Sequence, residues 1–169
     1  MRTSHVLFVA LLGVCLAAEA AQAETAAAPV RKPGFWETTM TMEGPHAHVM
    51  VTKVCTDAAL ERRTAMFGGA NPGKDCSVHE MHRTAGGFAF RSVCKRHDVT
   101  TTTAGKATGD FNSLYRVEST TRISAASGPP GRERHMVMDN RWLGACPAGR
   151  KPGDLILPSG EVMSMATPK

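Results

Sequence analysis

The sequence contains few of the residues that usually build a protein core. Only 22 of the 146 residues after position 23 are Leu, Ile, Val or Phe, and the whole chain has two tryptophans and one tyrosine. So low a proportion is typical of disordered chains. The formal net charge of +5 is modest, however, and ten methionines supply further apolar volume. The composition therefore excludes a large core rich in Leu and Ile, but it permits a single domain with a thin one.

Long apolar runs are also lacking. The one apolar segment, residues 6–18, follows Arg2 and precedes Ala21-Gln22-Ala23, a small-x-small cleavage site before Glu24. Together these features predict a signal peptide over residues 1–23 that is removed by cleavage. No later segment reaches the ~20 apolar residues that span a bilayer. We therefore expect an exported protein, periplasmic or secreted, without a transmembrane segment.

The chain lacks a C-x-x-C motif, which argues against a thioredoxin-type redox pair and a ribbon-type zinc site. Cys15 lies within the predicted signal peptide, where Val14 is too large for the position before a lipidated cysteine. Four cysteines remain, and an even number in an exported chain predicts two disulfides. These four are Cys55, Cys76, Cys94 and Cys146.

Period-two alternation of apolar and polar residues recurs through most of the chain. In residues 35–43, Trp36 and Met40 fall on one face of a strand, while Glu37 and Thr41 fall on the other. Such alternation predicts a strand with one buried face. By the same criteria and by β-branched content, further strands are expected at 48–54, 77–83, 88–94, 99–108, 111–123, 134–143, 155–157 and 161–163.

A single short α-helix is expected near residues 56–67, where Thr56 can cap the first turn and Gly68-Gly69 ends the last. Many short strands, one helix and frequent Gly/Pro turns predict a mainly β fold. We expect a curved antiparallel meander sheet, half-barrel or sandwich-like. Residues 24–32 are aperiodic and predicted to form a mobile leader, residues 33–165 a single β domain stapled by disulfides, and residues 166–169 a tail.

The hairpin at residues 84–87 bears on the disulfide pairing. A three-residue loop, Thr84-Ala85-Gly86, would place Cys76 directly opposite Cys94, close enough to bridge. A two-residue Gly86-Gly87 turn would instead place Cys76 near His97. The first arrangement predicts the pair Cys76–Cys94 and, by elimination, Cys55–Cys146.

Motifs of known enzymes are lacking. The chain has no G-x-S-x-G nucleophile motif, and its carboxylates form no assignable acid/base pair. We therefore assign no catalytic residue and no cofactor, and we keep an unrecognised hydrolase as the second alternative function. Nucleic acid binding is not expected, because the basic doublets are dispersed among acidic residues and no aromatic residue interleaves with them. Weak contact with anionic envelope components remains a hypothesis.

Histidine and methionine at alternate positions suggest a first alternative. His46 and His48 fall on one face of a strand, as do Met40 and Met42. Soft thioethers with imidazole can hold copper, so a periplasmic copper- or metal-binding protein is one interpretation of these four residues. The competing interpretation is that methionine fills an irregular core that is poor in Leu and Ile.

Several short motifs resemble one family. The segment Lys32-Pro33-Gly34-Phe35-Trp36-Glu37 resembles the P-G-x-W-E opening of a bacterial exported family known as domain-of-unknown-function family 3617. Val54-Cys55-Thr56, Thr108-Gly109-Asp110 and the segment 141–147 resemble later parts of that family in the same order. The resemblance implies an exported, β-rich, cysteine-paired domain without an assigned reaction.

At the matched positions we expect a framework rather than a site. Pro33 and Gly34 would set a turn, and Trp36 and Trp142 would offer large apolar surfaces to the core. The leading functional hypothesis is a small, monomeric, non-catalytic envelope protein that binds an unidentified ligand or partner. The concave face of a curved sheet can hold an apolar guest.

Overall fold

The computed structural model describes residues 29–44, 47–64, 75–129, 131 and 133–165. The predicted signal peptide, residues 24–28 of the predicted leader, the C-terminal part of the predicted helix (65–67), His46 and the tail at 166–169 lie outside these ranges. The secondary structure elements of the described residues are β1 (Gly34–Glu43), β2 (His48–Thr56), α1 (Ala58–Thr64), β3 (Cys76–Thr84), β4 (Gly87–Arg96), β5 (Val99–Gly109), β6 (Leu114–Ala125), β7 (Glu133–Gly144), β8 (Asp154–Ile156) and β9 (Val162–Ser164).

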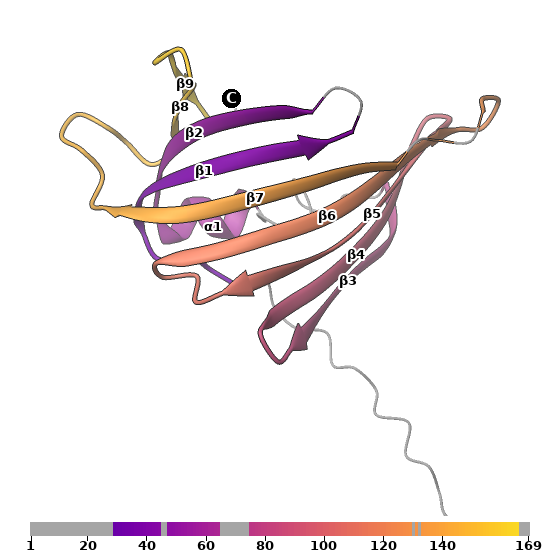
Figure 1. The fold of residues 1–169 in the computed structure, drawn as a ribbon, viewed down its shortest axis with the longest axis horizontal. Coiled ribbons are helices and arrows are strands. Elements are labelled where there is room, and N and C mark those ends of the chain that lie inside the picture. Colours follow the sequence, from indigo (N-terminus) through magenta and orange to yellow (C-terminus); the bar gives the residue numbers. More distant parts are fainter. Residues whose placement is uncertain (1–28, 45–46, 65–74, 130, 132, 166–169) are drawn as a thin grey trace, which may run out of the picture.

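These strands form a single open antiparallel sheet in the order β3-β4-β5-β6-β7-β1-β2-β8-β9 (Figure 1). The prediction of a mainly β, curved antiparallel fold is confirmed. Strands β3 to β7 follow one another as a meander, and the β1–β2 hairpin then joins the sheet beside β7. The result is one curved sheet rather than two packed sheets. None of the described helices is long and apolar enough to cross a membrane.

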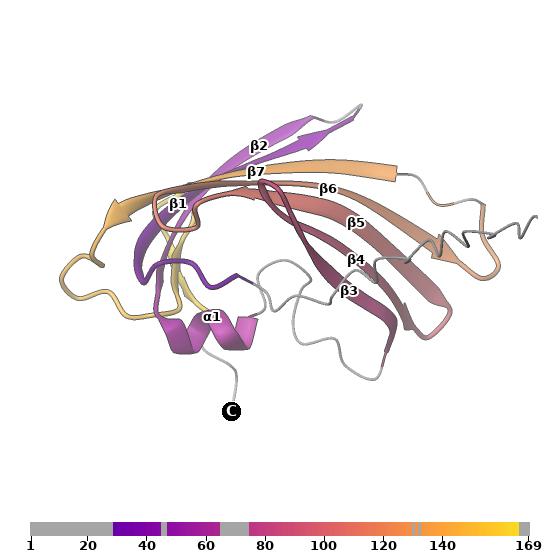
Figure 2. The same cartoon turned by 90° about the horizontal axis from the view of Figure 1, so that it is seen from below.

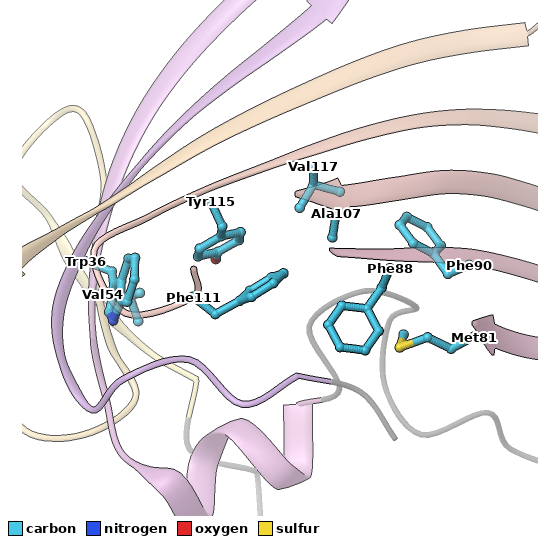
Figure 3. Close-up of a cluster of buried hydrophobic side chains, with 9 residues drawn as sticks. All are labelled: Trp36, Val54, Met81, Phe88, Phe90, Ala107, Phe111, Tyr115 and Val117. Atoms are coloured by element: carbon cyan, nitrogen blue, oxygen red, sulfur yellow. The ribbon is translucent and has the colours of Figure 1, made fainter. Parts of the chain in front are cut away.

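The sheet curves around α1, which lies on its concave side (Figure 2). The core occupies this side, where buried side chains from β1 to β6 gather between the sheet and the helix (Figure 3). Trp36 is fully buried, and its ring meets Tyr115 edge-on with the centroids 5.4 Å apart. Phe111 stacks on Tyr115 at 5.3 Å. Trp36 and Tyr115 thus come from strand positions that the period-two pattern predicts, whereas Phe111 precedes β6, which begins at Leu114 rather than at the predicted residue 111.

Helix α1 begins two residues later than expected, and its cap is a different residue. Thr56 still belongs to β2, and its hydroxyl donates a hydrogen bond to the Glu61 carboxylate at 2.5 Å. The cap is Asp57, whose Oδ1 accepts a hydrogen bond from the Leu60 amide at 2.7 Å. The prediction of Thr56 as the cap was therefore wrong, because its side chain is engaged by the helix's own carboxylate.

Residues 31 and 32, which precede the predicted boundary at residue 33, contact the domain. Arg31 is only 5% exposed, and its Nε donates to Glu61 Oε1 at 2.7 Å. A second guanidinium nitrogen donates to the Tyr115 hydroxyl at 3.2 Å, and the Lys32 amide donates to the Phe111 carbonyl at 2.9 Å. A buried ion pair thus ties Arg31, which the sequence assigned to the leader, to α1.

The four cysteines lie in two pairs at disulfide distance, Cys76 with Cys94 and Cys55 with Cys146. Their Cα atoms are 3.9 Å and 5.6 Å apart, respectively. The turn of the hairpin between β3 and β4 differs from both turns that the sequence suggested. Thr84 pairs with Gly87 across a two-residue turn, and a bulge between Cys76 and Val78 then restores Cys76 to the position opposite Cys94.

The expected framework residues surround the start of β1. The Trp142 indole donates to the Pro33 carbonyl at 3.2 Å, and the Lys32 ammonium lies 3.5 Å from the centroid of the Trp142 ring. Gly34 has a φ of 137°, and a Cβ there would collide with the Trp142 ring and the Gly144 carbonyl. Only glycine combines this conformation with so close an approach. Trp142 is half-buried, whereas Trp36 forms the centre of the core.

Candidate functional site

Five methionines meet on the concave face where β2, β1 and β7 lie side by side. Met40 of β1 is directly opposite Met50 of β2 and Met138 of β7, and Met42 of β1 is opposite Met136 of β7. Directly opposed residues of antiparallel strands have Cα atoms about 4.5–5.5 Å apart, and their side chains share a face. We call these five residues the methionine patch. It brings together residues that are about a hundred positions apart in the chain.

The methionine patch adjoins the core but is not part of it. Met138 is directly opposite Val117, a core residue, and packs against the core cluster. All five methionines are half-buried. Helix α1 covers the opposite end of these strands, where Trp36 and Val54 lie (Figures 2 and 3). Within the described residues, then, the patch is an apolar surface that continues the core along the concave face.

The predicted metal ligands are only partly brought together. Met40 and Met42 belong to the methionine patch, and His48 is directly opposite Met42 at the edge of that patch. His46 lies outside the described residues. In the part of the chain that the structure describes, no three His, Cys, Asp or Glu side chains form a cluster that could hold a metal ion. Among the described residues, the donors at this corner are therefore thioethers with one imidazole, that of His48.

The two faces of the sheet differ in charge. All six carboxylates of β1 to β7 have register positions on the convex face, and most of them form ion pairs there: Glu37, Glu43, Glu80, Glu118, Glu133 and Asp139. Glu37 pairs with Arg141 at 2.9 Å and with Lys53 at 3.6 Å. The hydrogen bond from Arg141 is the main cause of a lowered pKa at Glu37.

The concave face carries cations but no strand carboxylate. The basic residues of β1 to β7 on the same face as Trp36 are the arginines Arg83, Arg96 and Arg134 and the histidines His48 and His79. Of the three arginines, Arg96 pairs with Asp75 at 3.7 Å, and the Arg83 guanidinium lies over the Phe88 ring at 5.1 Å. No carboxylate of the described residues forms an ion pair with Arg134. This face thus combines an apolar surface with positive charge.

A hollow on the convex face bears on the hydrolase alternative. It has a volume of about 520 Å³, and its lining includes Glu43, Thr120 and His135. The Thr120 hydroxyl lies 3.0 Å from His135 Nδ1, and Glu43 is directly opposite His135. These residues sit within paired strands, where ladder hydrogen bonds occupy the backbone N–H groups that an oxyanion would need. The arrangement therefore gives no support to acyl transfer.

The sequence singled out Met40, Met42 and His48 but not Met50 or Arg134, and it did not show that the methionines of β1 and β7 converge. The pairs Met40/Met42 and Met136/Met138 were each visible as alternating methionines. Their convergence depends on the pairing of β1 with β7, which no local pattern encodes. Arg134 was missed as a site residue because it resembled the other dispersed basic residues until the two faces of the sheet could be distinguished.

Comparison with known proteins gives a family but no described function. No curated protein and no solved structure matches the chain. A family model described as a protein of unknown function, DUF3617, matches residues 31–146. The match begins at Arg31, the first residue that is tied into the fold by a buried ion pair, and ends at Cys146, the last cysteine. The chain belongs to the DUF3617 family.

Proposed function

We propose that this protein is an exported, non-catalytic binding domain that holds an apolar ligand on the concave face of its sheet. The observation that carries the proposal is the methionine patch, five half-buried thioether side chains on three adjacent strands. The signal-like residues 1–23 and the paired cysteines support export to an oxidising compartment. N-terminal sequencing of the protein purified from its own source should then begin at Glu24, and an intact Met1 would contradict export with cleavage.

Methionine suits such a role because its side chain is unbranched and polarisable. It adapts to guests of different shape, and surfaces that bind several apolar partners use it heavily. Leucine would fill a core equally well, but it adjusts less to a variable ligand. A ligand that covered the patch would remove these side chains from water, which favours binding by roughly 25 cal/mol per Å² of apolar area.

The proposal predicts that polar substitutions within the patch weaken binding. In a Met42→Gln/Met136→Gln double variant, two opposed thioethers become amides, whose desolvation opposes an apolar ligand. We expect the affinity for the uncharged fluorescent probe N-phenyl-1-naphthylamine to fall about tenfold, the equivalent of ~1.4 kcal/mol. Fluorescence titration measures this change, and circular dichroism checks that the variant is folded.

The matched control is Met163→Gln/Met165→Gln. These methionines are 49% and 38% exposed, and they lie at β9, away from the patch. The control should bind the probe like the wild type. If both double variants lost affinity equally, or if the wild type failed to bind the probe, the concave face would not be the binding surface.

A second candidate function is Cu(I) binding at the corner of the patch. The register that places His48 opposite Met42, and Met50 opposite Met40, favours it. Thioether sulfur and imidazole nitrogen suit Cu(I). We expect one equivalent of Cu(I) to be retained against a chromogenic Cu(I) chelator, and His48→Ala/Met42→Leu to lose at least tenfold in affinity. Met163→Leu is the control. Failure of the wild type to retain stoichiometric copper would exclude this candidate.

A further inference from the structure

Charge is distributed so that the concave face attracts anions. The six strand carboxylates are on the convex face, where four of them are held in the ion pairs Lys53–Glu37–Arg141, Lys106–Glu118–Arg116–Asp139 and Arg122–Glu133. On the concave face, the only charged side chains of β1 to β7 are basic. An anionic ligand would therefore meet attraction without a neighbouring strand carboxylate to repel it, which is the usual basis of electrostatic complementarity.

Arg134 lies beside the methionine patch. It precedes Met136 and Met138 at alternate positions of β7, so all three side chains share the concave face. Four residues of an antiparallel strand span about 14 Å, so an alkyl chain that begins at Arg134 can run over both methionines toward the core. Arg134 is exposed and is directly opposite Thr121, whose hydroxyl lies 3.2 Å from that of Thr103. The head of such a ligand would find a guanidinium and two hydroxyls.

We propose that the apolar ligand is a single-chain anionic amphiphile, a fatty acid carboxylate, with its head on Arg134 and its alkyl chain on the methionine patch. This inference rests on the proposed function and specifies its ligand. An arginine guanidinium offers a carboxylate two parallel N–H donors. The sheet is curved with this face on its concave side (Figure 2), a shape that suits a small occupant better than a flat bilayer.

The test compares ligands that share a chain but differ in the head. Decanoate, 1-decanol and decyltrimethylammonium are titrated separately below their micelle concentrations, with displacement of N-phenyl-1-naphthylamine as the readout. We expect wild-type protein to bind decanoate about tenfold more tightly than 1-decanol, and decyltrimethylammonium least tightly. Arg134→Gln should lose that tenfold preference and leave the affinity for 1-decanol unchanged, and Arg134→Lys should recover part of it.

The matched control is Arg122→Gln. Arg122 lies on the adjacent strand β6, but it faces the convex side and forms an ion pair with Glu133. This variant should retain the wild-type preference for decanoate. An Arg134→Gln variant that lost affinity for all three ligands equally would show a structural effect and overturn the assignment of Arg134 to the head.

The remaining outcomes separate this inference from the proposed function. Equal binding of decanoate and 1-decanol by the wild type would overturn the inference and leave the proposed function standing. Binding of none of the three ligands, with no binding of the probe, would overturn both. In a further outcome, the wild type would co-sediment with phosphatidylglycerol vesicles, Arg134→Gln would not, and decanoate would fail to displace the probe. That result would point to a membrane surface and overturn the single-chain ligand.

Discussion

Replacing Glu61 with alanine is expected to lower the free energy of unfolding by about 3–5 kcal/mol, because the change leaves a buried guanidinium without its counter-charge. The side chains of Arg31 and Glu61 are 5% and 2% exposed. The same carboxylate accepts a hydrogen bond from Thr56. The surroundings are dry enough that burial raises the pKa of the neighbouring Tyr115 to about 12. Urea denaturation at neutral pH measures the loss.

A double variant, Arg31→Met/Glu61→Leu, removes both charges of the ion pair but keeps apolar side chains in the space that the pair fills. Removing both charges abolishes the unpaired charge, so this variant should recover more than half of the loss caused by Glu61→Ala. Exposed pairs such as Arg116–Asp139 provide the comparison, since removal of Asp139 should leave the free energy of unfolding nearly unchanged. A Glu61→Ala variant as stable as the wild type would mean that residue 31 is not anchored to α1.

Removal of the Cys55–Cys146 pair is expected to destabilise the protein more than removal of Cys76–Cys94. The two cross-links join residues that are 91 and 18 positions apart. In the chain-entropy description, these separations correspond to about 4–5 and 3 kcal/mol. The paired variants Cys55→Ala/Cys146→Ala and Cys76→Ala/Cys94→Ala should unfold at correspondingly lower urea concentrations, in that order.

The test depends on which pair of substitutions lowers the free energy of unfolding more, because strain and residual structure alter the absolute size of each loss. Peptide mapping without reduction checks the connectivity itself, and a peptide joining Cys55 to Cys76 would refute it. If the variant without Cys76 and Cys94 proved the less stable of the two, loop closure would not be the main contribution of these cross-links.

The strands could be predicted from sequence because each encodes its own alternation. Residues 35–43 show this well, since Trp36 and Met40 share a face in the structure as in the pattern. What local patterns do not contain is the pairing of distant strands. The contact between β1 and β7 aligns Met40 with Met138 and joins Thr38 to Asn140 by a hydrogen bond of 2.6 Å. The methionine patch exists only because of that pairing.

Two other differences between prediction and structure have causes of different range. The bulge between Cys76 and Val78 compensates for the two-residue turn, so the cysteine pair forms by a different route from the one the turn residues suggested. Arg31 looked like part of a charged leader because its partner, Glu61, is thirty residues away and on a helix. The bulge is a local irregularity that the turn residues do not encode, whereas the contact of Arg31 with Glu61 is long-range and no pattern within one segment reveals it.

Methyl NMR of protein labelled at methionine offers a direct view of the concave face, because the methionine methyl groups report separately on the patch and on β9. On titration with decanoate, we predict that the signals of the patch shift, namely those of Met40, Met42, Met50, Met136 and Met138. The signals of Met163 and Met165 should stay in place. Shifts confined to Met163 and Met165, or no shift at saturating decanoate, would contradict the proposal that the concave face binds an anionic amphiphile.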